Sequence, residues 1–552
     1  MDDVLELCKS TMEKFDAIDI GDVRIAHEYV AIDFEVHGIS FTLYTLCSNV
    51  TPTMPFVTAT NADNSLPHFL LRELVVGDKK IRSICLYENE HYISHLFSIE
   101  EKIEFIISQL LSLLNLSASE IEAEYQKEFL YYWNNKVESK SSYSVYLDNT
   151  CSYSLLELYR INDERVERFA IVHPNIRINQ QVKKDWQAVS NKTAIFIEIK
   201  QTKGIIPPLR NSGWDVKTIL DIIDNKQIQQ IEYDAYKFLT NISYNHKSVV
   251  FVFKINNLIF GCELHFKNKG VAKLMDKIKL NTAKLEYLYT TRVDFQYLNQ
   301  QIGNDTSLLA LKVAIVGIGS LGSYVATEIV KSGVKKLTLI DEDSIDVENI
   351  MRHRSTINDA GLSKSFSLAY DLHKYHPEVN VTYLKERLRP ENIDDYLKED
   401  VDVVVFTGLG SDSLIGLNRT LHRLKFSKPI LYSWLEGDGQ SGHVVGIDYS
   451  KSGCFQCLFT DEHGKKVPNK LNQSSDTDKK IIRNGCGGVR VAYGNIILLQ
   501  TTALILDGLN HILSADFDAN FANRVAKNTF QSSTTSFYEG TCDCCNDSSQ
   551  MP

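Results

Sequence analysis

The chain has 552 residues, 43% of them hydrophobic and 23% charged, and a formal net charge of −11. This length predicts several domains, and the acidic balance argues against nucleic acid as a main partner, because phosphate binding needs clustered Lys and Arg. Polar residues interrupt the two most apolar stretches, 104–116 and 496–513, which indicates buried helices and no membrane partner. The N-terminus opens with acidic residues and shows no secretory leader, so the eleven cysteines predict thiols and metal ligands in a cytoplasmic protein.

Residues 1–135 form the first predicted domain, an α+β unit. Segments 23–37 and 39–47 have the character of strands, and 98–133 has helical spacing. The segment between them, 49–68, contains three prolines and is expected to be a loop.

Residues 136–300 form a mixed α/β middle region. Strands are expected at 194–199 and 249–253, and a helical run at 218–239. No chemical motif in this region rises above background, so its role stays open.

Residues 301–552 alternate between strands and helices. Strands are expected at 311–316, 336–340, 379–384 and 401–406, and helices at 321–332 and 364–375. This alternation predicts an α/β domain with a mostly parallel sheet and helices on both faces. The polar stretch 461–483 is expected to be a mobile loop.

A glycine-rich turn joins the first predicted strand and helix of this last region. Gly317, Gly319 and Gly322 have the spacing that lets a backbone approach a phosphate at a helix N-terminus, and Asp341 ends the next strand where a ribose-binding acid is expected. Taken alone, these residues indicate a nucleotide site, with NAD as the default ligand.

The residues that follow argue against NAD. Within one loop and the next helix start, the chain places carboxylate, amide and basic side chains: Asp343, Asn349, Arg352, His353 and Lys364. Hydride transfer does not need several cations near the phosphates. An adenylating enzyme does, because it stabilises charge on the α-phosphate and on the leaving pyrophosphate.

These motifs together resemble the ThiF/MoeB/ubiquitin-activating superfamily over about residues 292–545. They are Gly317–Gly322, Asp341–Asp343, Asn349–His353 and Gly361–Lys364. The form of the Asn349–His353 segment is similar to bacterial activating–conjugating fusion enzymes of CBASS-type and related ubiquitin-like conjugation operons.

The resemblance implies a Rossmann-like adenylation domain over 301–552 that uses ATP and Mg²⁺. It also implies that Asp341 binds ribose, that Asn349, Arg352 and Lys364 contact the phosphates, and that Arg292 reaches ATP across a homodimer interface. One position departs from the family: where an acidic residue, often linked to magnesium, usually follows the strand 401–406, this chain has Leu409. Asp412, in the next turn, is the candidate substitute.

Two Cys-x-x-Cys pairs supply four candidate metal ligands, Cys454 with Cys457 and Cys542 with Cys545. Four thiolates form the tetrahedral set of a structural Zn²⁺ site, and members of the resembled superfamily use such a site to fix the C-terminal tail. Cys544 is an extra thiol that could replace a neighbour.

Two further cysteines are candidate catalytic nucleophiles. Cys486, between glycines after the polar stretch, resembles the catalytic cysteine of bacterial activating enzymes. Cys85 follows the prolines of 52–55 and the pair Pro67-His68, a pattern similar to the conjugating domain of the fusion enzymes. The resemblance therefore implies a ubiquitin-conjugating-like domain over 1–135.

The resulting hypothesis has three steps: ATP-dependent adenylation of the C-terminal tail of a ubiquitin-like modifier protein, thioester formation on Cys486, and transfer through Cys85 to an amine of an unknown protein target. An adenylating sulfur-carrier enzyme of the ThiF/MoeB type and a nucleotide-binding scaffold without catalysis remain alternatives.

Overall fold

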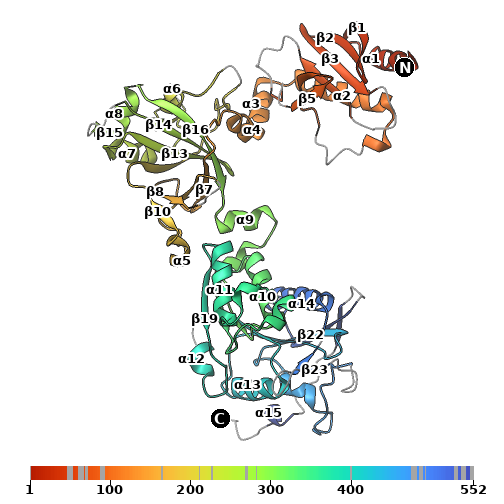
Figure 1. The fold of residues 1–552 in the computed structure, drawn as a ribbon, viewed down its shortest axis with the longest axis vertical. Coiled ribbons are helices and arrows are strands. Elements are labelled where there is room, and N and C mark those ends of the chain that lie inside the picture. Colours follow the sequence, from red (N-terminus) through yellow and green to blue (C-terminus); the bar gives the residue numbers. More distant parts are fainter. Residues whose placement is uncertain are drawn as a thin grey trace. The chain divides into compact units, whose positions relative to one another are not determined.

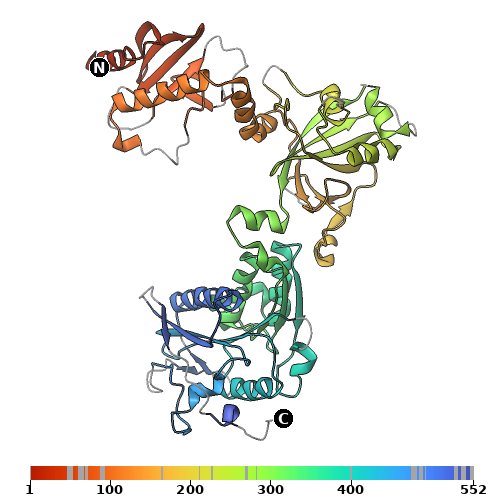
Figure 2. The same ribbon diagram turned by 180° about the vertical axis from the view of Figure 1, so that it is seen from behind.

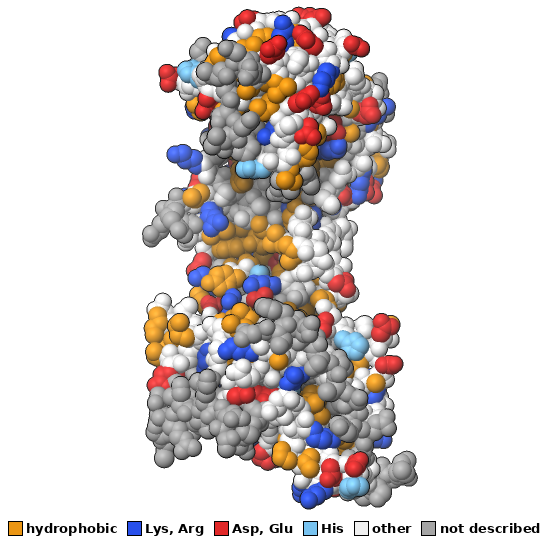
Figure 3. Space-filling view, turned by 90° about the vertical axis from the view of Figure 1, so that its right-hand side faces the viewer, with side chains coloured by type: hydrophobic (Ala, Val, Ile, Leu, Met, Phe, Trp, Pro, Cys, Tyr) orange, Lys and Arg blue, Asp and Glu red, His pale blue; other side chains and the backbone are white. Residues whose placement is uncertain are grey.

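The computed structural model describes residues 2–46, 54–59, 67–68, 72–87, 94–162, 166–209, 212–224, 228–267, 272–280, 282–397, 401–473, 481–483, 489–491, 493–527, 532–535 and 542–546. The chain separates into two compact units (Figures 1 and 2). The first contains 1–174 and 188–292, and the second contains 175–187 and 293–552. Acidic and basic side chains are interspersed over the coloured surface in Figure 3.

The first unit begins with an antiparallel sheet in the order β1-β2-β3-β4 and a separate hairpin, β5–β6. Helices α1 and α2 contribute to the apolar core on one face of this sheet. The elements are α1 (Asp2–Met12), β1 (Asp19–Ala26), β2 (Tyr29–Val36), β3 (Ile39–Leu46), β4 (Phe56–Ala59), β5 (Arg72–Val76), β6 (Lys79–Ser83) and α2 (Ile99–Leu114). The predicted strand 23–37 is two strands, because a turn with His27 at a φ of 57° joins β1 to β2.

The predicted helical stretch 98–133 is three helices, α2, α3 (Ala118–Lys127) and α4 (Phe129–Asn134). A capping box of Ser117 and Glu120 starts α3 and thereby ends the run of α2. The apolar face of α4 packs into the next core, where Phe129 and Trp133 contact Trp214.

The rest of the first unit is a mixed sheet in the order β10-β8-β11-β13-β14-β16-β7-β9. Strand β8 pairs with β11 through residues 153–156 and with β9 through 157–161, so the sheet closes on itself. The predicted strands 194–199 and 249–253 lie in β11 and β13, and the predicted helical run 218–239 is divided between α6 and α7. The elements are β7 (Ser142–Tyr146), β8 (Tyr153–Ile161), β9 (Arg168–Val172), β10 (Trp186–Ala188), β11 (Thr193–Ile199), α6 (Val216–Ile223), α7 (Tyr233–Asn241), β12 (Ser243–Tyr244), β13 (Ser248–Ile255), β14 (Leu258–His265), β15 (Ala272–Lys273), α8 (Leu274–Lys279) and β16 (Lys284–Arg292).

The second unit is built on a sheet in the order β19-β18-β17-β20-β21-β22-β25-β26. Its first five strands are parallel and the last three antiparallel. Helices α10, α11 and α14 share one core with the sheet, and α12 and α13 share another, on the opposite face. The elements are α5 (Gln180–Lys183), α9 (Phe295–Gln301), β17 (Lys312–Val316), α10 (Ser320–Lys331), β18 (Lys336–Ile340), α11 (Lys364–Tyr375), β19 (Asn380–Leu384), α12 (Ile393–Leu397), β20 (Val403–Thr407), α13 (Ser411–Arg423), β21 (Ile430–Leu435), β22 (Ser441–Ile447), β23 (Ile481–Arg483), β24 (Val489–Val491), α14 (Asn495–Leu513), β25 (Phe521–Ala526), β26 (Ser532–Thr535) and α15 (Asp543–Asn546).

The predicted parallel α/β alternation of residues 301–552 is confirmed, with each expected strand and helix displaced by no more than two residues. Among the helices that the structure describes, α14 is the one long and apolar enough to cross a membrane, and half of it is buried inside the unit. Its buried residues contact β21, β22 and β25, as in a core helix.

Candidate functional site

The glycine turn lies at the point where the order of the parallel strands reverses. Strand β17 pairs with β18 on one side and with β20 on the other, all parallel. The loops after these strands therefore leave the same edge of the sheet in opposite directions, which opens the crevice where α/β sheets bind ligands. The turn connects β17 to α10 in this crevice.

The three glycines of the turn have different roles. Gly317 has a φ of +92°, and a Cβ there would lie 2.2 Å from the carbonyl oxygen of Thr407. A Cβ at Gly322 would lie 1.9 Å from the carbonyl oxygen of Gly317, whereas a Cβ at Gly319 would meet no protein atom within 4 Å. The fold itself therefore requires Gly317 and Gly322, while Gly319 leaves open space at the N-terminus of α10 for a phosphate.

Asp341 ties the glycine turn to the loop after β18. Its Oδ2 accepts the N–H of Ile318 at 2.6 Å, and its Oδ1 accepts the N–H of Asp343 at 2.8 Å. Burial raises the pKa of Asp341, and the positive charge of Lys364 opposes this effect. A carboxylate fixed in this way keeps further lone pairs that can accept ribose hydroxyls.

The predicted phosphate-binding residues lie beside this carboxylate in two groups. Lys364, the first residue of α11, places its Nζ 2.7 Å from Oδ2 of Asp343, and its side chain is only 11% exposed. Arg352 donates to Oδ1 of Asn349 at 2.8 Å and lies over the ring of Tyr493, 5.4 Å from its centroid. Each group combines a cation with an oxygen acceptor.

His353 contacts the glycine turn through its buried ring. Its ring Nε2 donates to the carbonyl oxygen of Ile318 at 2.8 Å, and its Nδ1 accepts the N–H of Ser355 at 3.1 Å, which assigns the neutral tautomer. Burial lowers the pKa of His353. Both ring nitrogens of His353 are therefore used inside the protein.

Sequence reasoning missed Thr407, whose hydroxyl donates to the carbonyl oxygens of Gly317 and Val316. Thr407 ends β20 directly before Gly408, and a threonine at a strand end beside a glycine is the signal that could have found it. Leu409 packs against the core below α13, and Asp412 is exposed in the first turn of that helix.

The remaining predicted ATP contact, Arg292, belongs to the first unit. It ends β16, is buried, and donates to Oδ1 of Asn149. Its predicted reach to ATP stays a prediction.

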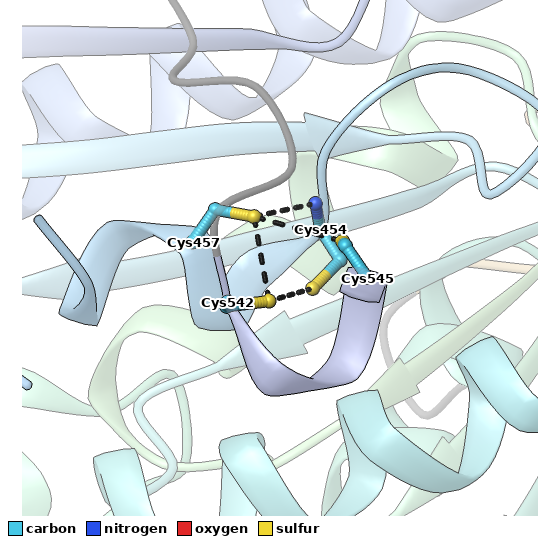
Figure 4. Close-up of side chains that lie close together, drawn as sticks. All are labelled: Cys454, Cys457, Cys542 and Cys545. Atoms are coloured by element: carbon cyan, nitrogen blue, oxygen red, sulfur yellow. Dashed lines mark hydrogen bonds between the residues drawn. The ribbon is translucent and has the colours of Figure 1, made fainter. Parts of the chain in front are cut away.

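The four predicted metal ligands come together in one cluster (Figure 4). The Sγ atoms of Cys454, Cys457, Cys542 and Cys545 all lie within 4.8 Å of one another, with three separations of 3.6, 3.6 and 3.7 Å. Four thiolates around one Zn²⁺ at about 2.3 Å would be about 3.8 Å apart. The set therefore fits a tetrahedral metal, and Zn²⁺ is the ion that this donor chemistry favours.

Asn418 of α13 supports the cluster from the unit's core. It is fully buried, and its Nδ2 donates to Sγ of Cys454 at 3.4 Å and, more weakly, to Sγ of Cys544 at 3.8 Å. Its Oδ1 accepts the N–H of Phe455 at 3.0 Å. Cys544 thus lies beside the tetrahedral set rather than in it.

The two candidate nucleophiles differ in what can be described. Cys486 lies outside the described residues; the strands that flank its segment, β23 and β24, pair antiparallel. Cys85 is exposed, in the coil after β6, and its N–H donates to the carbonyl oxygen of His68 at 3.1 Å. Nε2 of the His68 ring contacts Oε2 of Glu124 at 3.1 Å, and the backbone N–H of His68 donates to the hydroxyl of Tyr132 at 3.0 Å.

An open α/β sheet with a glycine turn, a fixed acid after the second strand and basic side chains beside it defines a Rossmann-like nucleotide-binding domain. Comparison with protein families identifies the family to which this domain belongs. Residues 295–534 match the ThiF family. This part of the chain is a ThiF family domain.

The individual relatives share low sequence identity with this chain. The chain is 22% identical over 346 residues to the ATP-dependent ubiquitin transferase-like protein Cap2 of Pseudomonas aeruginosa, covering 59% of this chain and 60% of the relative. It is 26% identical over 170 residues to ubiquitin-like modifier-activating enzyme 5 of Dictyostelium discoideum, covering 28% and 44%. The matched region thus spans less than two thirds of either relative. Among solved structures, MccB of E. coli matches 45% of this chain and 69% of its own at 19% identity and a TM-score of 0.33.

Proposed function

We propose that this chain activates the C-terminal carboxylate of a ubiquitin-like protein with ATP, accepts it as a thioester on Cys486, and passes it through Cys85 to an amine of a target protein. The observation that carries the first step is the crevice of the ThiF family domain. There, Gly319 leaves space beside the N-terminus of α10. Asp341 lies beside this space, together with the hydrogen-bonded pairs Lys364–Asp343 and Arg352–Asn349.

In the adenylation step, a modifier carboxylate oxygen attacks the α-phosphate of ATP, and pyrophosphate leaves. Asp341 holds the ribose, and Lys364 and Arg352 stabilise the charge that develops on the phosphates. Both cations are pre-positioned by Asp343 and Asn349, so little reorganisation is needed when charge develops. Mg²⁺ would supply further charge neutralisation, with Asp412 the candidate ligand.

The next two steps use the cysteines in order. Cys486 belongs to the same unit as the nucleotide crevice, which supports its role as the first acceptor of the acyl group. Of the two cysteines described in residues 1–135, Cys8 is buried and Cys85 is exposed, which supports a second transfer by Cys85 in a conjugating-like domain over 1–135. The four-cysteine cluster holds Zn²⁺ in a structural role.

A second copy of the chain is proposed as the partner of the ThiF domain. On α14, Ile496, Leu499 and Leu513 are 41–52% exposed and follow the spacing of a heptad seam. Sedimentation equilibrium would measure a homodimer directly.

ATP–pyrophosphate exchange tests the proposed function. The purified chain is given ATP, Mg²⁺, labelled pyrophosphate and a set of recombinant ubiquitin-fold proteins that end in glycine. We expect exchange with at least one of them, and none with the same protein lacking its terminal glycine. Exchange without an adduct that a thiol reductant removes would favour the sulfur-carrier alternative, and no exchange with any protein would favour the scaffold.

A further inference from the structure

Arg352 contacts an aromatic ring from a distant part of the second unit. The arginine ends the short helix Val347–Arg352, and its guanidinium carbon lies 5.4 Å from the centroid of the Tyr493 ring, directly before α14. The face of an aromatic ring at this distance attracts a guanidinium. The contact therefore joins a predicted phosphate ligand to a residue that has no part in the chemistry described so far.

The Tyr493 ring is held in place by α14. Tyr493 precedes Gly494, the N-cap of this helix, and its half-buried side chain packs against the core that the sheet shares with α10 and α14. In the first turn of α14, Ile497 and Leu498 are fully buried in the same core. A tyrosine has only two side-chain torsions, so a ring fixed in this way is a rigid surface for a flexible partner.

The segment that carries Arg352 is also attached to the glycine turn. The ring of His353 donates to the carbonyl oxygen of Ile318 at 2.8 Å, and Oδ1 of Asn349 accepts from Nη2 of Arg352 at 2.8 Å. The backbone is thus fixed beside the turn, but the long arginine side chain has several rotatable bonds, and ordering them opposes ligand binding. The Tyr493 ring restricts this freedom before a ligand arrives.

The two cations of the crevice are oriented by different kinds of partner. Lys364 is oriented by the carboxylate of Asp343, whose negative charge offsets part of its own. Asn349 and Tyr493 are neutral, so they orient Arg352 without offsetting its charge. A cation held by neutral groups is well suited to stabilise negative charge that develops on a phosphate.

We propose that Tyr493 is a positioning residue for the adenylation step, because its ring holds the Arg352 guanidinium in the orientation that stabilises charge on the phosphates of ATP. This inference rests on the proposed function. In that step a modifier carboxylate oxygen forms a bond to the α-phosphorus. The bond from this phosphorus to the bridging oxygen of pyrophosphate breaks, and pyrophosphate leaves with the electron pair. Arg352 then meets the added charge without first having to reorient.

Two substitutions separate the contribution of the ring from that of the hydroxyl. Tyr493→Leu removes the ring and keeps an apolar side chain, whereas Tyr493→Phe removes only the hydroxyl. Tyr324→Leu is the matched control, because Arg354 lies over the Tyr324 ring at the same distance of 5.4 Å. Combining Tyr493→Leu with Arg352→Ala shows whether the ring acts through this arginine.

The readouts are pyrophosphate exchange, with the ubiquitin-fold protein that supports it, and calorimetric titration with ATP and Mg²⁺. We expect Tyr493→Leu to lower the exchange rate and to raise the Kd for ATP, each about fivefold, the size of a partly buried cation–π contact. Tyr493→Phe and Tyr324→Leu should stay within about twofold of wild type in both measurements. In the Arg352→Ala background, Tyr493→Leu should change either quantity by less than about twofold.

Wild-type exchange and ATP affinity in Tyr493→Leu, or equal losses in Tyr493→Phe or Tyr324→Leu, would overturn the proposal. An undiminished loss in the Arg352→Ala background would also overturn it, because the ring would then act through packing alone. ATP binding without pyrophosphate exchange in the wild-type chain would instead contradict the proposed function. The titrations need no modifier, so they would still decide whether Tyr493 acts through Arg352. A wild-type chain that binds no ATP would contradict both.

Discussion

Gly322→Ala should lower the stability of the fold, whereas Gly319→Ala should weaken ATP binding, although both residues lie on the same turn. At Gly322 the new Cβ would lie 1.9 Å from the Gly317 carbonyl oxygen and 2.6 Å from Oγ1 of Thr407. At Gly319 it would project into open space at the N-terminus of α10. The first change therefore strains the fold, and the second occupies space that a phosphate needs.

The magnitudes follow from these contacts. Forcing a methyl group against backbone costs about 3 kcal/mol, the upper end for overpacking, because a carbonyl cannot rotate away as a side chain can. The better helix propensity of Ala returns about 1 kcal/mol in α10, which leaves about 2 kcal/mol, or a Tm lowered by about 4–8 °C for a unit of this size. Gly319→Ala should change Tm by less than about 2 °C but raise the Kd for ATP at least about tenfold, the loss of one charge-assisted hydrogen bond to phosphate.

Thermal unfolding and calorimetric titration with ATP and Mg²⁺ measure both effects without a modifier. Gly416→Ala is the control, because its Cβ would only touch Pro390 at 3.7 Å, away from the turn. Wild-type ATP affinity in Gly319→Ala would show that the phosphates do not approach this turn. An unchanged Tm in Gly322→Ala would refute the packing argument.

Three further outcomes are expected. Arg352→Ala should lower pyrophosphate exchange about a hundredfold with an unchanged Tm, because it removes one contact to developing phosphate charge. Exchange at the wild-type rate would show that Arg352 does not contact the phosphates. Elemental analysis should find one zinc per chain in the wild type and in Cys544→Ser but less in Cys545→Ser. Zinc lost in Cys544→Ser and retained in Cys545→Ser would instead make Cys544 the fourth ligand. On a non-reducing gel with ATP and modifier, Cys486→Ala should lose every thiol-sensitive adduct. Cys85→Ala should keep the first adduct and stop target modification; normal modification by Cys85→Ala would require a separate conjugating enzyme.

The local parts of the nucleotide crevice could be predicted from the sequence, because the glycine turn and Asp341 are separated by one strand–helix–strand unit. The cysteine cluster could also be predicted, since paired thiols carry their own signal. Contacts between distant residues could not: Glu436 holds Gln473, and β8 pairs with both β9 and β11. Polar composition predicted a loop over 461–483, but it could not show that Val467 and Lys470 donate backbone hydrogen bonds to Phe459 and Leu458.

The cysteine cluster also sets an order of events during synthesis of the chain. Cys542 follows Cys457 by 85 residues, and a ribosome adding about 5–20 residues per second needs about 4–17 s to cover that distance. During this interval Cys454 and Cys457 have no partner pair, although both are fully buried in the finished unit. Asn418 of α13 can contact Cys454 and Phe455 before the second pair is made, whereas its contact with Cys544 forms only afterwards. A chain interrupted in this interval would carry only two of the four thiols, so it could not complete the tetrahedral set that the finished unit contains.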